Sequence, residues 1–155
     1  MKLTKGDVAG SDLVAGLAKV IRSWEPGDLA NELKYRDSLL AYLREAIPSD
    51  CSVEKEYRYA GTTTDLFVRW SGLLLKGEAF IEVKRNLDKK ATLDRLVGQI
   101  EALQPGKRRI LVVLVGKTDD ALLGRFKEKY KYYFDAQFEH HLAIIVKQTP
   151  VPNVG

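Results

Sequence analysis

The sequence predicts an α/β domain in which a central mixed β-sheet is flanked by helices on both faces. Two observations support this fold class: the order of the predicted elements and one strand that is apolar throughout. Two helical patterns precede three consecutive strand patterns, and helices then alternate with strands to the end of the chain. Consecutive strands usually pair antiparallel, whereas a strand reached through a helix is usually parallel to its predecessor. Residues 110–115 are all apolar, as expected for a strand covered on both faces.

Two helices are predicted at the start of the chain. Residues 10–24 place apolar side chains at helical spacing, with Ser11 or Asp12 as N-cap, and a Pro-Gly pair ends this helix. Asp28 is expected to cap a second helix that runs to residue 46. The apolar stripe of the second helix consists of Leu29, Leu33, Leu40, Leu43 and Ile47.

The three strands that follow show period-two alternation. They cover residues 53–59, 64–70 and 79–84, with turn signals around residues 73–75 that predict a hairpin. In the second strand the alternation buries Leu66 and its alternate neighbours, which leaves Asp65 on the opposite face. In the third strand the same argument places Glu82 and Lys84 together on one face, opposite a face made of Ala79, Ile81 and Val83.

The second half of the chain alternates helix and strand. We expect a helix over residues 88–103, the buried strand at 110–115, a helix over 119–134 and a last strand over 141–148. Phe126, Tyr130 and Phe134 recur at a spacing of four, which favours core packing. This division gives an N-terminal helical arm at 1–27, a main domain at 28–149 and a tail at 150–155.

Composition narrows the class of protein. The 155 residues carry a formal charge of +4, which is compatible with a nucleic-acid partner without requiring one. A single cysteine excludes an intramolecular disulfide and a cysteine-based zinc site. No apolar run reaches the roughly 18 to 20 residues that span a bilayer, and no signal peptide is evident, so we expect a cytoplasmic protein without membrane contact.

Asp65, Glu82 and Lys84 form the outline of a metal-dependent phosphodiester site. Mg²⁺ prefers hard oxygen ligands while keeping several waters, and it can neutralise phosphoryl charge and supply a nucleophilic water. The two carboxylates and the backbone carbonyl of Val83 would form such a partial shell. Lys84 would orient the water or stabilise the developing negative charge. The acid-x-lysine pattern also occurs at residues 32–34 and 88–90, but only Glu82 lies on a strand beside another acid-bearing strand.

These residues resemble the PD-(D/E)xK nuclease superfamily, with Thr64-Asp65 in place of Pro-Asp and Glu82-Val83-Lys84 as the second half of the motif. The resemblance implies a restriction-endonuclease-like αβββαβ core over roughly residues 28–116. It also implies Mg²⁺- or Mn²⁺-dependent cleavage of DNA, or less often RNA, leaving a 5′-phosphate. Glu32 corresponds to an accessory acid, here a further metal ligand, and Gln99 to a supporting glutamine in the helix after the lysine.

Each assignment has an ordinary structural alternative. Glu82 and Lys84 would also suit a surface ion pair, and Glu32 could pair with Arg36 one helical turn later. Gln99 could simply be exposed. Four basic residues are expected to contact DNA phosphates at the mouth of the site, or else to form a solvated basic surface: Arg85, Lys89, Lys90 and Arg95.

The function expected from these observations is a structure-specific or non-specific endonuclease. No zinc finger, helix-turn-helix or other sequence-reading element is evident, which argues against a sequence-specific restriction enzyme. A homodimer is expected, because cutting both strands of a duplex requires two sites. Alternatives are a Holliday-junction resolvase, a catalytically inactive nucleic-acid-binding or assembly module on the same fold, and a protein-interaction domain.

Overall fold

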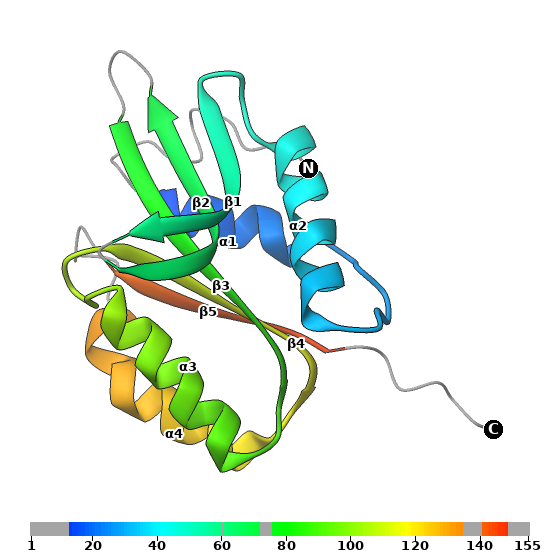
Figure 1. Ribbon diagram of the computed structural model, residues 1–155, viewed down its shortest axis with the longest axis vertical. Helices are drawn as coiled ribbons and strands as arrows, with labels where there is room; N and C mark the ends of the chain where they lie inside the picture. Colours follow the sequence, from blue (N-terminus) through cyan, green and yellow to red (C-terminus); the bar gives the residue numbers. More distant parts are fainter. Residues whose placement is uncertain (1–12, 60, 72–75, 135–140, 149–155) are drawn as a thin grey trace.

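The computed structural model describes residues 13–59, 61–71, 76–134 and 141–148. A five-stranded mixed sheet forms its centre, with strand order β1-β2-β3-β4-β5 (Figure 1). The strands are β1 (Cys51–Tyr59), β2 (Thr62–Ser71), β3 (Lys76–Leu87), β4 (Arg109–Thr118) and β5 (Leu142–Lys147). The helices are α1 (Leu13–Arg22), α2 (Glu32–Ala46), α3 (Lys90–Ala102) and α4 (Asp120–Tyr130), and a short 3-10 helix, η2 (Lys131–Phe134), follows α4.

The pairing of the strands confirms the predicted mixed sheet. β1, β2 and β3 are successive antiparallel neighbours, and β4 and β5 continue the sheet in parallel. α3 connects β3 to β4, and α4 connects β4 towards β5, as expected for helical crossovers between parallel strands. α3 and α4 contact each other on one side of the sheet, and α1 and α2 pack on the other (Figure 1).

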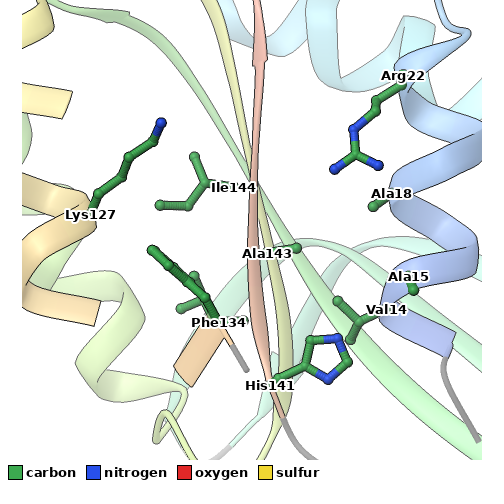
Figure 2. A pocket seen from close by; sticks show the side chains of 10 residues that line it. Val14, Ala15, Ala18, Arg22, Lys127, Phe134, His141, Ala143 and Ile144 are labelled. Carbon is green, nitrogen blue, oxygen red and sulfur yellow. The ribbon is translucent and has the colours of Figure 1, made fainter. Parts of the chain in front are cut away.

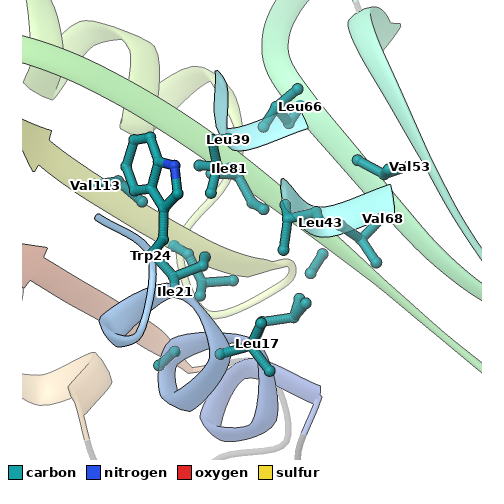
Figure 3. Packing of buried hydrophobic residues seen from close by; sticks show 14 of the residues in the cluster. Leu17, Ile21, Trp24, Leu39, Leu43, Val53, Leu66, Val68, Ile81 and Val113 are labelled. Carbon is teal, nitrogen blue, oxygen red and sulfur yellow. The ribbon is translucent and has the colours of Figure 1, made fainter. Parts of the chain in front are cut away.

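The larger core fills the space between the sheet and helices α1 and α2. Leu17 and Ile21 of α1 and Leu39 and Leu43 of α2 are fully buried around Ile81 of β3 (Figure 3). The segment predicted as an N-terminal arm therefore contributes its helix to the main core, because its apolar stripe is covered by the sheet rather than by solvent.

A second core lies between the sheet and α3 and α4. Phe80 of β3, Phe126 of α4 and Ile100 of α3 are among its fully buried members. β4 contributes alternate residues to the two cores, and none of its residues from Ile110 to Val115 is more than 1% exposed. This confirms the expectation of a strand covered on both faces.

The start of α2 differs from the prediction. Asn31, and not Asp28, is the N-cap, and its side chain accepts a hydrogen bond from the Lys34 amide at 2.9 Å. Asp28 instead accepts a hydrogen bond from the Tyr35 hydroxyl in the loop before the helix. With this start the buried face of α2 excludes Leu33, which is 58% exposed, so its assignment to the apolar stripe is wrong.

Some predicted features lie outside the described residues: the caps at Ser11 and Asp12, the turn at 73–75 and the tail at 150–155. The helix predicted at 88–103 agrees with α3, the helix at 119–134 with α4 followed by η2, and the last strand with β5. Their ends differ from the predictions by one or two residues at most. Among the helices in the described ranges, none combines the length and the apolar character needed to cross a bilayer.

Candidate active site

Asp65 and Glu82 occupy facing positions on β2 and β3. Leu66 lies opposite Ile81, so extending this antiparallel register by one residue places Asp65 opposite Glu82. Leu66 and Ile81 point into the core under α1 and α2. Successive side chains alternate between the two faces, so the carboxylates of Asp65 and Glu82 emerge together on the face that α3 and α4 cover. The structure thus brings the two predicted acids together.

Hydrogen bonds of Asp65 and Thr64 with β3 hold the N-terminal part of β2 in place. The Val83 amide donates to Asp65 Oδ2 at 2.8 Å, in a position where a backbone carbonyl would normally accept. The hydroxyl of the fully buried Thr64 donates to the Ile81 carbonyl at 3.3 Å. Thr64 was identified from the sequence only as a replacement for proline, and its anchoring role has no local sequence signal. Together these bonds hold the Asp65 carboxylate against β3.

Glu82 is a buried acid and not a member of a surface pair. Only 2% of the Glu82 surface is exposed to solvent, which excludes the alternative of a solvated Glu82–Lys84 ion pair. Burial, followed by the charge of Asp65, raises the pKa of Glu82 to about 8. Burial likewise raises the pKa of Asp65. Two adjacent buried carboxyls of this kind retain a proton near neutral pH unless a cation replaces it.

Glu32 links the start of α2 to the far end of β3. Its Oε2 accepts a hydrogen bond from the Arg85 amide at 3.0 Å, and its Oε1 lies 3.5 Å from Lys84 Nζ. The predicted alternative, an ion pair between Glu32 and Arg36, is not formed. Arg36 is buried and its guanidinium binds Glu56 at 2.9 Å and Asp37 at 3.0 Å. Glu32 therefore joins the cluster of Asp65, Glu82 and Lys84 through the lysine.

Gln99 lies on α3, the helix that follows β3. The side chain is half-buried, and its Oε1 is buried and accepts no hydrogen bond from the described residues. The alternative of a fully exposed Gln99 therefore does not hold.

The four predicted phosphate contacts lie around the junction of β3 and α3. Lys89 and Lys90 stand at the N-cap and first residue of α3 and are exposed, as is Arg95. Arg85 is half-buried, and its Nε is buried and donates no hydrogen bond to the described residues. Lys89 provides no side-chain cap for the helix. The exposed cations thus lie at the N-cap and in the first two turns of α3, the helix that follows the strand carrying Glu82 and Lys84.

The donor set fits a hard divalent cation with an incomplete protein shell. Two carboxylates, Asp65 and Glu82, face each other, and the Val83 carbonyl points to the same edge of β3 as its amide, because both groups of one strand residue share an edge. In the described ranges no three His, Cys, Asp or Glu residues group closely enough to form a complete cage. An open set of this kind suits Mg²⁺, which usually retains several waters.

Comparison of the chain with family models, with curated proteins and with solved structures found no match. The chemistry of this site is therefore inferred from its own side chains and their positions.

Proposed function

We propose that this protein is a metal-dependent nuclease that hydrolyses phosphodiester bonds of DNA, with a core of the restriction-endonuclease-like kind. The observation that carries the proposal is the convergence of Asp65, Glu82 and Lys84 from two neighbouring strands. Support also comes from the order α2, β1, β2, β3, α3, β4, which follows the αβββαβ order of the PD-(D/E)xK superfamily that the motif resembles. Cleavage of RNA is a less favoured version of the same chemistry.

The two acids and the Val83 carbonyl would hold Mg²⁺ or Mn²⁺. When bound, the ion supplies positive charge for the phosphoryl oxygens and lowers the pKa of a coordinated water. The protein fixes one carboxylate in advance, because Asp65 is tied to the Val83 amide. Glu32 would have to release Lys84 and the Arg85 amide to bind the ion directly, so it is the more distant member of the predicted ligand set.

Lys84 supplies a positive charge on the same face as Glu82. Its side chain is 12% exposed and its ammonium is directed to Glu32, which restricts where the charge lies. A cation fixed in this way stabilises the negative charge that develops on a phosphoryl group under attack, without reorganising during the reaction. Gln99 Oε1, which lacks a hydrogen-bond donor among the described residues, would support the attacking water or the substrate from α3.

The basic residues at the start of α3 favour a polyanionic substrate. Lys89 and Lys90 place positive charge at a helix N-terminus, where the helix dipole makes cations unfavourable. Phosphates of a nucleic acid would offset this cost and would lie beside the end of β3. Contacts of this kind carry affinity without sequence information, which supports structure-specific or non-specific cleavage.

A cleavage assay with matched variants tests this function. Linear duplex, single-stranded and four-way branched DNA are incubated with Mg²⁺ or Mn²⁺ and with wild-type protein or the variants Asp65→Asn, Glu82→Gln and Lys84→Ala. We expect each variant to lose on the order of 100-fold or more in rate, because each removes a group that acts on the reacting phosphate. Glu78→Gln is the control, because Glu78 lies on β3 like Glu82 but is exposed to solvent.

The outcomes separate the alternatives. Preference for the four-way junction would identify a resolvase, and equal cleavage of all substrates a non-specific nuclease. Metal-independent DNA binding without cleavage would indicate an inactive binding module. Cleavage that is unchanged in all three variants would show that the site has been placed wrongly.

A further inference from the structure

The two edges of the sheet are built differently. At the β1 edge, Glu54, Lys55 and Glu56 place charges along the strand, and Glu56 has a φ of 55°, which breaks the regular ladder. Charges and irregular backbone are common devices that prevent an edge strand from pairing with another chain. At the β5 edge, Ala143 to Val146 are four consecutive apolar residues in regular strand conformation. Only the β1 edge carries this protection along its length.

The β5 edge offers peptide groups for a further strand. The Ile110 amide donates to the His141 carbonyl at 3.3 Å, so the peptide groups of alternate residues starting at 141 face β4. By the same alternation, the amides and carbonyls of Leu142, Ile144 and Val146 face away from β4. Within the described parts of the chain, β4 is the only strand that pairs with β5.

A groove of about 410 Å³ lies along this edge. α1 forms one wall, with Val14 and Ala18, and α4 with η2 forms the other, with Phe134 (Figure 2). Figure 2 shows Arg22 and Lys127 on opposite sides of β5. Both are exposed, and none of the described residues that line the groove is acidic. The groove therefore combines an apolar floor, open backbone groups and a cation on each wall.

We propose that the β5 edge is a docking site for an extended acidic segment of a partner protein, which adds to the sheet as a sixth strand. Its backbone would pair with the outward peptide groups of β5, and its apolar side chains would pack against the walls of the groove. Its carboxylates would lie between Arg22 and Lys127. This role is independent of the proposed nuclease site, which lies on β2 and β3.

Charge decides against a second copy of this chain as the occupant. Antiparallel pairing of two β5 strands about a two-fold axis would place the α1 helices on one face and the α4 helices on the other. The two grooves would then adjoin, and each contributes Arg22 and Lys127 while none of its described lining residues is acidic, so cations would be brought together without a counter-charge. A nucleic acid would meet the two cations but has no backbone donors and acceptors to match the edge of a strand.

Labelled peptides test the docking site in solution. The probe is a fluorescein-labelled octapeptide with the repeat Val-Val-Glu-Glu, which as a strand presents valine and glutamate to both faces of the sheet. It is titrated against full-length protein in EDTA so that cleavage chemistry plays no part. We expect saturable binding, and chemical-shift changes at the Leu142, Ile144 and Val146 amides. N-methylation of the alternate peptide residues whose amides pair with β5 should abolish binding, whereas N-methylation of the intervening residues should not, because only the first set removes ladder hydrogen bonds.

Charge-reversal variants provide the second arm. Arg22→Glu with Lys127→Glu should weaken binding of the glutamate peptide by at least about tenfold and create binding of the matching lysine peptide. Arg44→Glu with Arg125→Glu changes the net charge equally at exposed positions that do not line the groove, and should have little effect. The proposal would be overturned if the glutamate peptide did not bind, or if both double variants bound it equally well. It would also be overturned if Arg22→Glu with Lys127→Glu weakened DNA binding and left peptide binding unchanged, or if the wild type were a dimer that this double variant dissociates.

Discussion

Replacing Glu82 by glutamine should change how the stability of the metal-free protein depends on pH. The folded protein keeps the Glu82 proton up to a pKa of about 8, whereas the unfolded chain loses it near the usual 4.5. Between these values the unfolded state binds fewer protons than the folded state, so the free energy of unfolding falls as pH rises. The raised pKa of Asp65 acts in the same direction.

The size of the effect follows from the same window. Each pH unit over which one proton separates the two states changes the free energy of unfolding by about 1.4 kcal/mol. From pH 4.5 to 8 this amounts to a loss on the order of 4 kcal/mol in wild-type protein. Glu82→Gln keeps the shape and the hydrogen-bonding capacity of the side chain but cannot ionise, so the variant should lose much less and should be the more stable protein at pH 8.

Urea denaturation at pH 5, 6.5 and 8 in EDTA measures this difference. Glu45→Gln, a change at an exposed position of α2, is the control and should follow the wild type. Adding Mg²⁺ at pH 8 should stabilise the wild type and not Glu82→Gln, because the ion replaces the proton between deprotonated carboxylates. Parallel pH curves for wild type and Glu82→Gln would refute the idea that buried Glu82 keeps a proton that a cation can replace.

Three further changes test the fold. Leu39→Ala should cost about 2 to 5 kcal/mol in urea denaturation because Leu39 is fully buried, whereas Leu33→Ala at an exposed position should cost little; similar losses at both positions would contradict the placement of α2. Gly116→Ala should destabilise the protein by about 1 to 3 kcal/mol, because Gly116 has φ +72° and an added Cβ would lie 2.4 Å from Asn86 Oδ1. An unchanged urea midpoint would contradict this backbone conformation at Gly116. Burial raises the pKa of Cys51 to about 11, so iodoacetamide at pH 8 should modify it in urea but not in the native protein; rapid native labelling would show that β1 is more open than described.

The sequence predicted the features that depend on local periodicity. Successive side chains on β2 and β3 point to opposite faces, so the sequence assigned Asp65 and Glu82 to their faces before the pairing was known. The apolar run of β4 predicted burial on both sides for the same reason. The mixed character of the sheet followed from the connections, because consecutive strands favour antiparallel pairing and a helix between two strands favours a parallel arrangement.

Features that depend on distant contacts were not predictable in this way. Asp28 and Asn31 are both good N-caps, and local sequence does not decide between them. α2 begins at Glu32, whose carboxylate binds the Arg85 amide from 53 positions away. Arg36 pairs with Glu56, which has a left-handed backbone conformation in β1, and no local signal in the sequence indicates either feature.

The most direct test of the central claim is the position of a bound divalent ion. Crystals grown or soaked with Mn²⁺ would locate the ion through its anomalous scattering. We expect a single strong peak between the carboxylates of Asp65 and Glu82, and no peak there in Asp65→Asn. An ion bound elsewhere, or a site that stays empty at millimolar Mn²⁺ while the two acids remain side by side, would contradict the account.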